Sequence, residues 1–195
     1  MSKRVILVTG TPCVGKTSVA HLLTARLDAL YINLTDLAMR ENLISGKDKE
    51  RNSIIIDENR MKNRIRGIIS ECDKKNVVVD GHYAVNVVPK ELATYVFVLR
   101  RDPVELRKFM QRCGFSNKKL SENLASEILD VCLVDALSIH GEGKICEVNF
   151  TGKSLEEVVN EILEIMDNPT KCCVGIVDWL GKLESEGLLD EFLKI

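Results

Sequence analysis

A glycine-rich stretch near the N-terminus carries the residue types that can hold a phosphate group. An apolar run over residues 5–9 leads directly into Gly10-Thr11-Pro12-Cys13-Val14-Gly15-Lys16-Thr17, which fits the pattern G-x-x-x-x-G-K-S/T of a phosphate-binding loop. Glycines let backbone N–H groups turn toward phosphate oxygens, and the positive end of the next helix dipole points at the same anion. A chance glycine turn is the alternative, but the strand, the spacing and the Lys-Thr pair together favour the phosphate loop.

This loop and the start of the following helix are expected to bind a nucleotide and its metal ion. Lys16 can reach the β- and γ-phosphates of ATP, and the Thr17 hydroxyl can ligate Mg²⁺. Cys13 lies near a helix N-terminus, where the pKa of a thiol can be lowered. The residues of this stretch that we predict to bind the nucleotide are Gly10, Cys13, Val14, Gly15, Lys16, Thr17 and Ser18.

A second apolar strand, residues 76–80, ends in an acidic residue. In a phosphate-loop enzyme, a carboxylate at that point holds the Mg²⁺ shell opposite the Thr17 hydroxyl, so Asp80 is a candidate metal ligand. The alternative is a turn-forming Asp before Gly81. His82 could orient a water or a phosphate oxygen near the transferred group, or it could be an ordinary structural histidine.

A basic stretch, residues 100–119, contains seven Lys or Arg residues. One interpretation is a lid whose arginines, Arg112 and also Arg100, close over the phosphates of ATP, because a guanidinium pairs bidentately with phosphate oxygens. The break at Cys113-Gly114 between two predicted helices is where such a lid would bend. The alternative is a solvated helix face.

Four charged residues flank a polar segment, residues 45–53, that we predict to be a solvated loop. In a kinase, an insertion of this kind binds the acceptor of the phosphoryl group. Surface charges on two short helices are the alternative interpretation. The four candidates are Asp36, Arg40, Asp57 and Arg60.

Apolar strands alternate with amphipathic helices along the chain, which predicts an α/β fold with a parallel sheet and helices on both faces. A length of 195 residues suits a single domain. The predicted strands are residues 5–9, 29–33, 76–80, 94–99 and 144–150. The predicted helices start at residue 16 and include residues 37–43, 57–70, 102–111, 121–139 and 155–166, followed by a helical tail, residues 174–195, with breaks at Gly181 and Gly187.

The overall composition excludes several classes of protein. A net charge of −2 gives no general attraction to nucleic acid or an acidic membrane. Seven cysteines are scattered without a C-x-x-C pair, which indicates reduced thiols rather than a disulfide scaffold or a zinc site. No run approaches the length of a transmembrane helix, and no signal peptide is evident. These features predict a cytoplasmic protein.

With these residues identified, the chain resembles the adenylate kinase isoenzyme 6 family, small atypical adenylate kinases of archaea and eukaryotic nuclei. The similarity covers about residues 4–165, and the segments at 33–38 and 80–82 make it more specific than the phosphate loop alone. The stretches that carry it are Thr9-Gly10-Thr11-Pro12-x-Val14-Gly15-Lys16-Thr17, Tyr31-Ile32-Asn33-x-x-Asp36-Leu37-Ala38, Asp57-Glu58-x-Arg60, Val79-Asp80-x-His82, Val96-Phe97-Val98-Leu99-Arg100 and Gly114-Phe115-Ser116-x-Lys118-Lys119-Leu120.

The resemblance implies a five-stranded parallel sheet, an acceptor-binding insertion at about residues 33–57 and a short lid at about residues 112–121. The resemblance does not extend to the tail, residues 168–195, which we predict to belong to the same domain. It implies transfer of phosphate from ATP to AMP with Mg²⁺, ATPase activity, and a small-subunit ribosomal protein as partner. The chain differs from the family at Cys13, where glycine is usual, at Met39, with Arg40 next to it, and at Cys113, where the lid arginine is usual and Arg112 stands one place earlier.

The first hypothesis is therefore an AMP kinase that uses ATP. Lys16, Asp80, His82 and Arg112 are the predicted catalytic residues, and Thr17 and Asp80 the predicted metal ligands. A ribosome-assembly ATPase with vestigial kinase activity and a small-metabolite kinase are the two alternatives. A GTPase is disfavoured, because Asn117-Lys118-Lys119-Leu120 lacks the Asp that reads guanine.

Overall fold

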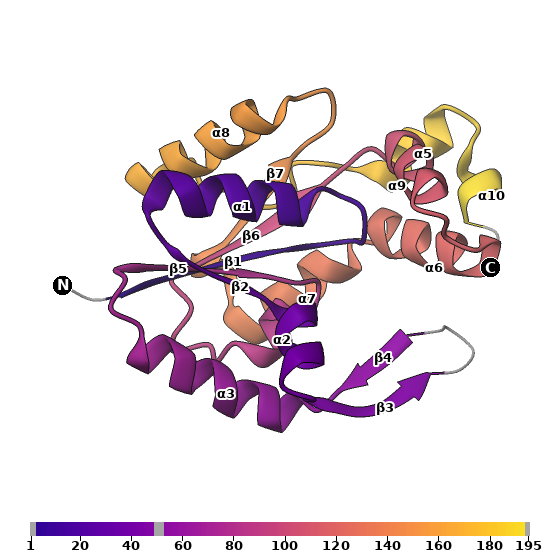
Figure 1. Ribbon diagram of the computed structural model, residues 1–195. Coiled ribbons are helices and arrows are strands. Elements are labelled where there is room, and N and C mark those ends of the chain that lie inside the picture. Colours follow the sequence, from indigo (N-terminus) through magenta and orange to yellow (C-terminus); the bar gives the residue numbers. More distant parts are fainter. Residues whose placement is uncertain (1–2, 49–52, 194–195) are drawn as a thin grey trace.

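Five strands form one parallel sheet (Figure 1). They are β1 (Arg4–Gly10), β2 (Leu30–Asn33), β5 (Asn76–Asp80), β6 (Tyr95–Arg100) and β7 (Ile145–Asn149). Their order across the sheet is β2-β5-β1-β6-β7, so β1 is central. The computed structural model describes residues 3–48 and 53–193. The predicted α/β fold with a five-stranded parallel sheet is confirmed.

Helices cover both faces of the sheet (Figure 1). Those on one face are α1 (Lys16–Leu27) and α8 (Leu155–Asp167), and those on the other include α3 (Glu58–Glu71) and α7 (Val131–His140). The sheet is also contacted or flanked by α2 (Leu34–Arg40), α4 (Ala84–Val87), α5 (Pro103–Arg112) and α6 (Asn117–Ile128).

Side chains of β1 alternate between two hydrophobic clusters. Ile6 and Val8 pack in the cluster that contains the buried residues of α1 and α8. Val5 and Leu7 pack in the other cluster, with the buried residues of α3 and α7. A parallel strand that is buried on both faces is apolar throughout, which explains the continuous apolar run before the phosphate loop.

A β-hairpin occupies much of the predicted acceptor insertion. β3 (Ile44–Asp48) pairs antiparallel with β4 (Ser53–Ile56). The prediction of a solvated loop over residues 45–53 is therefore wrong for residues 45–48 and 53. The isoleucines of β4 favour an extended strand, and β3 pairs with that strand. Residues 49–52 of that predicted loop lie outside the described part of the chain.

The predicted single helix over residues 121–139 is two helices, α6 and α7. The helices are separated at Asp130, whose backbone is left-handed with a φ of 56°. Arg100 in β6 donates to the Glu127 carbonyl oxygen at 2.9 Å and pairs with the Asp130 carboxylate. This buried guanidinium thus provides a hydrogen-bond donor for a carbonyl oxygen in the last turn of α6 and holds the turn at Asp130. Helical periodicity in the sequence cannot show such a tertiary contact.

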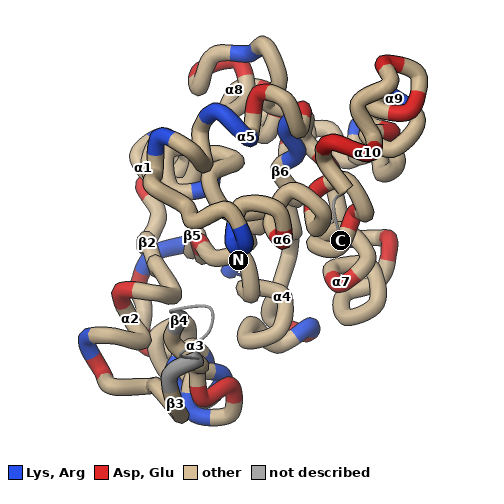
Figure 2. The backbone as a smooth tube through the Cα atoms, turned by 90° about the vertical axis from the view of Figure 1, so that its right-hand side faces the viewer, with Lys and Arg blue, Asp and Glu red and all other residues tan. Residues whose placement is uncertain are grey.

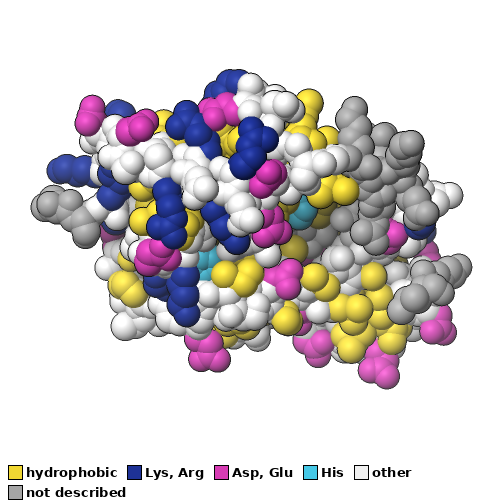
Figure 3. Space-filling view, turned by 90° about the horizontal axis from the view of Figure 1, so that it is seen from below, with side chains coloured by type: hydrophobic (Ala, Val, Ile, Leu, Met, Phe, Trp, Pro, Cys, Tyr) yellow, Lys and Arg dark blue, Asp and Glu magenta, His cyan; other side chains and the backbone are white. Residues whose placement is uncertain are grey.

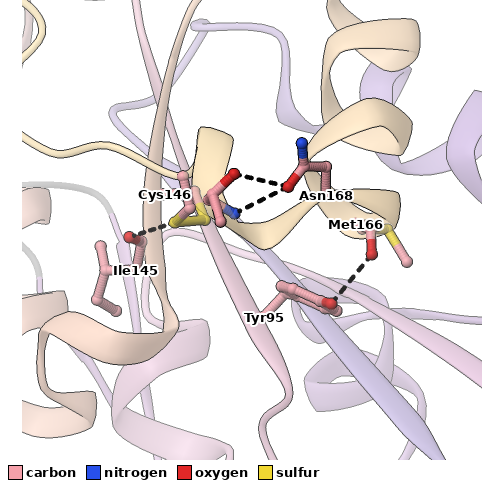
Figure 4. The surroundings of a disulfide bond; sticks show 7 residues. Tyr95, Ile145, Cys146, Met166 and Asn168 are labelled. Atoms are coloured by element: carbon pink, nitrogen blue, oxygen red, sulfur yellow. Dashed lines mark hydrogen bonds between the residues drawn. A yellow bond between two sulfur atoms is a disulfide. The ribbon is translucent and has the colours of Figure 1, made fainter.

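The segment after α8 runs along the edge strand β7. The Glu147 N–H donates to the Cys173 carbonyl oxygen at 2.9 Å, and a disulfide joins Cys146 to Cys172 with 5.0 Å between their Cα atoms (Figure 4). In the same region, the Tyr95 hydroxyl donates to the Met166 carbonyl oxygen at 3.2 Å (Figure 4). The prediction that all seven cysteines are reduced thiols is wrong for this pair, because the fold brings residues 146 and 172 together.

Two short helices end the described chain, α9 (Trp179–Ser185) and α10 (Leu189–Phe192). Gly187 breaks the tail as predicted, with a φ of 68°, but Gly181 lies inside α9, so the predicted break there is wrong. The reason is local: the Gly181 N–H donates to the Asp178 carboxylate, the N-cap of α9, at 2.8 Å, and a Cβ at this position would collide with that carboxylate. Acidic residues gather on the side that carries α7, α9 and α10 (Figure 2).

In the described part of the chain, no helix is long and apolar enough to cross a membrane.

Trp179 anchors the tail and gives a first prediction. Its side chain is 6 % exposed and its indole N–H donates to Glu127 Oε1 at 3.0 Å. We expect Trp179→Ala to lower the free energy of unfolding by about 3–5 kcal/mol, through the cavity and the lost hydrogen bond. The measurement is urea denaturation followed by circular dichroism, because the variant lacks the chain's single tryptophan.

The neighbouring Leu180→Ala is the matched control for this measurement. Leu180 is 42 % exposed, so its truncation should change the free energy of unfolding by only about 0.5 kcal/mol. Equal effects of the two substitutions would show that the tail does not dock through Trp179.

Candidate active site

The phosphate loop connects β1 to α1 and depends on two glycines. Gly10 has a φ of 132°, and a Cβ there would lie 2.5 Å from the Leu99 carbonyl oxygen. Gly15 has a φ of 114°, and a Cβ there would lie 2.6 Å from the ring of Phe150. Gly15 is also the N-cap of α1 and offers no capping side chain, so the first N–H groups of the helix are available to an anion.

Lys16 folds back over the loop. Its ammonium donates to the carbonyl oxygens of Gly10 and Thr11, both at 2.9 Å. Burial lowers the pKa of Lys16, an effect that Asp80 and other nearby groups partly offset. The ammonium therefore sits at the mouth of the loop, where it can exchange carbonyl oxygens for phosphate oxygens.

Asp80 is the centre of a hydrogen-bonded group at the carboxyl ends of three strands. Its Oδ2 atom accepts from the Thr17 hydroxyl at 2.8 Å, the Tyr31 hydroxyl at 3.0 Å and the Asn33 amide at 3.0 Å. The side chain is 2 % exposed. Asp80 lies beside Val8 in the ladder of β1 and beside Asn33 in that of β2, so the sheet register produces this grouping.

The Thr17 and Asp80 oxygens fit a magnesium ion. Mg²⁺ prefers hard oxygen ligands and is usually held by one or two protein groups plus phosphate oxygens and water. In the described part of the chain, no group of three or more His, Cys, Asp or Glu side chains could hold a metal by itself. Thr17 and Asp80 would therefore share the ion with the phosphates of a nucleotide.

His82 follows this strand and borders the phosphate loop. The hydroxyl of Thr9 donates to the His82 carbonyl oxygen at 2.9 Å, which holds the backbone against β1. Desolvation by the surrounding walls, and then the positive charges of Lys16 and Lys119, lower the pKa of the imidazole to about 4. His82 is therefore neutral at pH 7 and can accept a hydrogen bond.

A cavity of about 490 Å³ adjoins the loop on the side of α5. Arg101 stacks on both Phe109 and Phe150, 4.6 and 4.1 Å from their ring centroids, and forms one wall. The predicted lid residue Arg112 lies 5.8 Å from the centroid of Phe109, close to this cavity. The residues that line the cavity are Cys13, Gly15, Ser18, Arg101, Glu105, Phe109, Phe150, Lys153 and Leu155.

Cys13 lines the same cavity, but the prediction of a lowered thiol pKa is wrong. Burial and a hydrogen bond with the Cys113 thiol raise the pKa of Cys13 to about 11. The nearby charges of Lys16 and Lys119 act in the opposite direction and are outweighed.

Arg100 does not take the phosphate-binding role that the sequence suggested. Its guanidinium is 2 % exposed and pairs with Glu127, Asp130 and Glu147. Three carboxylates occupy its donors, so Arg100 is a core residue that joins the sheet to α6 and α7.

Two further cavities lie near the predicted acceptor residues. One, of about 350 Å³, is lined by Asp36 and Arg40 together with Tyr31, Asn33 and Arg64. The other, of about 300 Å³, opens from the loop, and its lining includes Thr11, Pro12, Glu58, His82, Tyr83, Asn86 and Asn123.

Asp57 and Arg60 shape the insertion rather than line these cavities. The Asp57 carboxylate caps α3 by accepting from the Arg60 N–H at 3.0 Å, and the Arg60 guanidinium donates to the Asn42 carbonyl oxygen at 3.1 Å.

Seen from below the view of Figure 1, basic side chains gather over the part of the face that carries α3, and hydrophobic side chains gather on the opposite part (Figure 3).

Sequence reasoning missed Glu127, which supports the loop from α6. Glu127 is 2 % exposed, and its Oε2 atom accepts from the Thr11 hydroxyl at 2.6 Å. The one sequence signal for Glu127 is its position on the apolar face of an amphipathic helix. An acidic residue is rarely buried without a partner, so its presence on that face could have indicated a role. Tyr31 and Asn33 belong to a motif that carries the family resemblance, but their hydrogen bonds to Asp80 were not predicted from the sequence.

A comparison with protein families matches residues 6–130 to an "AAA domain" family. A protein named "Putative adenylate kinase" from Pyrococcus furiosus is 39 % identical over 175 residues, which cover 90 % of this chain and 91 % of the relative. A protein of the same name from Methanocaldococcus jannaschii is 34 % identical over 177 residues, with coverage of 91 % and 93 %.

Two solved structures share the fold. A gluconokinase from Sinorhizobium meliloti 1021 has a TM-score of 0.55 at 18 % identity and covers 86 % of this chain and 93 % of its own. A shikimate kinase from Bacteroides thetaiotaomicron has a TM-score of 0.55 at 16 % identity, with coverage of 85 % and 98 %.

The depressed pKa of His82 gives a prediction on pH dependence. Between pH 6.5 and about 4 the unfolded chain binds a proton that folded His82 does not, so this residue's contribution to stability is complete above pH 6.5 and is lost as the pH falls. We expect the imidazole NMR signal of His82, without nucleotide or metal, to titrate with a midpoint of about 4.

His82→Asn identifies that signal and should flatten the fall in unfolding free energy between pH 7 and pH 5. A midpoint at or above 6.5 would contradict the environment described for this side chain.

Proposed function

The chain belongs to the same family as these archaeal proteins and is a phosphate-loop phosphotransferase, and from this premise we propose that it transfers the γ-phosphoryl group of MgATP to AMP. The observation that carries the proposal is the Asp80 group. One carboxylate accepts hydrogen bonds from Thr17 of the phosphate loop and from Tyr31 and Asn33 of β2. The donor side and the insertion that would bind the acceptor thus meet at one buried charge.

The phosphate donor would lie along the loop. The first N–H groups of α1 and the Lys16 ammonium would bind its phosphates, and Thr17 with Asp80 would hold Mg²⁺, which supplies charge neutralisation on the phosphate oxygens. The aromatic and cationic walls of the cavity beside α5, formed by Phe109, Phe150 and Arg101, suit a flat base and its ribose phosphate. Arg112 would reach the phosphates from the end of α5.

The acceptor would lie in the cavity that opens from Thr11 and Pro12. His82, Tyr83 and Asn86 form one side of it, and Glu58 at the start of α3 forms another. The phosphate of AMP is already a nucleophile, so positioning and electrostatics suffice for transfer. Asp36, Arg40, Asp57 and Arg60 belong to the segment that flanks this cavity, and they stay our proposed acceptor-side residues.

A second function, ATP hydrolysis, is favoured by His82. A neutral imidazole two residues from Asp80 can accept a hydrogen bond from an attacking water, and so position it, when no acceptor excludes it. A small-metabolite acceptor is the further alternative. The ribosomal protein partner and the cytoplasmic location stay predictions from the sequence.

The loop lysine provides the test of phosphoryl transfer. We expect Lys16→Ala to reduce ADP formation by at least about a hundredfold, because a preorganised positive charge on the transferred group is lost. Circular dichroism should show that the fold survives. Lys74→Ala, which removes an exposed lysine paired with Asp28, is the matched control and should retain full activity. ADP formation by the Lys16 variant at the wild-type rate would refute the assignment.

The acceptor is tested by product balance. Transfer to AMP converts one ATP and one AMP into two ADP and releases no inorganic phosphate. We expect ADP to appear only when AMP is present, and CMP, GMP, UMP, gluconate and shikimate to be poorer acceptors. Phosphate release that is independent of AMP would identify hydrolysis as the main reaction, and faster turnover with a sugar acid would identify a small-metabolite kinase.

A further inference from the structure

A disulfide fastens the segment that follows α8 to the edge strand β7. It joins Cys146, which lies in β7 and is 1 % exposed, to Cys172, which is half-buried (Figure 4). The chain's other five cysteines are free thiols. We propose that this disulfide is a reversible redox modification site: a small dithiol reduces it, and residues 172–178, here called the strap, then separate from β7.

The strap has few apolar contacts to hold it in place without the disulfide. Val174 is 39 % exposed and Ile176 is 43 % exposed. Three hydrogen bonds between the strap and β7 involve Glu147. Its N–H donates to the Cys173 carbonyl oxygen at 2.9 Å, and its Oε2 atom accepts from the N–H groups of Gly175 and of Ile176. Burial of apolar surface therefore contributes little to the docking of the strap, and the covalent bond is its main attachment.

The elements on either side of the strap dock independently of it. Upstream, α8 buries its apolar face against the sheet. Downstream, the tail buries Trp179, Leu183 and Phe192 in the same hydrophobic cluster, each at most 6 % exposed. The strap can therefore open between two docked helices, as a local event that leaves the rest of the fold intact.

The reduction proceeds by two thiol–disulfide exchanges. One thiolate of the dithiol attacks the sulfur of Cys172, the less buried of the two residues, forms a mixed disulfide and releases the Cys146 thiolate, which takes up a proton. The second thiolate then attacks the reductant's sulfur in the mixed disulfide. This step closes the reductant's own disulfide and releases the Cys172 thiolate, which takes up the other proton. The protein disulfide gains two electrons and two protons, and the dithiol loses them.

Opening of the strap would uncover an edge of the sheet and a buried charge. β7 is an edge strand in the order β2-β5-β1-β6-β7, and the N–H and C=O groups of an edge strand are available to a neighbouring segment unless something covers them. The Glu147 carboxylate beneath the strap is buried and pairs with Arg100. The redox state of one bond would therefore determine whether water reaches this carboxylate and the free side of β7.

The experiment uses the whole protein, with dithiothreitol as the reductant. Hydrogen–deuterium exchange is followed by mass spectrometry on peptides that cover residues 145–149 and 172–178. We expect the amides of Glu147, Gly175 and Ile176 to exchange at least about tenfold faster after reduction, because their hydrogen bonds open with the strap. Oxidised glutathione should restore slow exchange. The emission wavelength of Trp179 should stay unchanged, because α9 remains docked.

Two variants of neighbouring cysteines separate the disulfide from a general effect of thiols. Cys172→Ser should exchange at the fast rate without dithiothreitol, and the reductant should change nothing further. Cys173→Ser, which lacks an exposed free thiol one residue away, is the matched control and should respond to dithiothreitol as the wild type does. The reduced wild type makes the same comparison without a substitution, so a variant that does not fold leaves the test intact.

Three results would overturn the proposal. They are equal exchange rates in the disulfide and dithiol forms, cysteines 146 and 172 that stay unlinked after treatment with oxidised glutathione, and a red shift of the Trp179 emission on reduction, which would show that release is not confined to the strap. The measurement needs no nucleotide, so it is independent of the proposed phosphoryl transfer.

Discussion

The buried guanidinium of Arg100 connects the sheet to the elements that support the phosphate loop. It projects from the end of β6, donates to Glu127 at 2.9 Å and also pairs with Asp130 and Glu147. Burial disfavours its charge, but the carboxylates of Glu127 and Asp130 outweigh that effect and hold the pKa of Arg100 above its ordinary value. Removing one partner of a buried ion pair costs about 3–5 kcal/mol, because the other charge is left uncompensated.

The carboxylates around Arg100 extend this network to both ends of the chain. Glu127 accepts from the Thr11 hydroxyl with one oxygen and from the Trp179 indole with the other. Glu147 accepts from the Ile176 N–H at 3.0 Å. The phosphate loop is therefore supported by α6 and by the C-terminal segment, which lie more than a hundred residues away in sequence. Trp179 of the tail and Thr11 of the loop thus bond to the same carboxylate.

The sequence allowed the sheet and the core of the site to be predicted because both follow from local patterns. Residues 5–18 contain a strand, a glycine loop and a helix start, and Asp80 ends a second apolar strand, so parallel pairing alone brings Asp80 to Thr17. The interruption at Asp130, the role of Arg100 and the Cys146–Cys172 disulfide could not be predicted, because each depends on contacts between distant segments. The raised pKa of Cys13 could not be predicted for the same reason: a helix N-terminus is visible in sequence, whereas the burial of the thiol is not.

Lys16 is held within the phosphate loop by main-chain carbonyl oxygens. Its ammonium is desolvated, and the carbonyl oxygens of Gly10 and Thr11 accept hydrogen bonds from it at 2.9 Å. Neutral carbonyl oxygens stabilise a buried cation less than anionic phosphate oxygens do, so a polyphosphate can displace them at little cost in reorganisation. The same exchange would free the carbonyl oxygens of Gly10 and Thr11. The backbone at Gly10 is packed closely against that of Leu99, which holds this end of the loop in place. In the proposed reaction, nucleotide binding would change the partners of Lys16 and, with Mg²⁺, those of Thr17 and Asp80, while the sheet that positions these side chains would keep its register. Such a fixed framework is the condition for preorganised electrostatic catalysis.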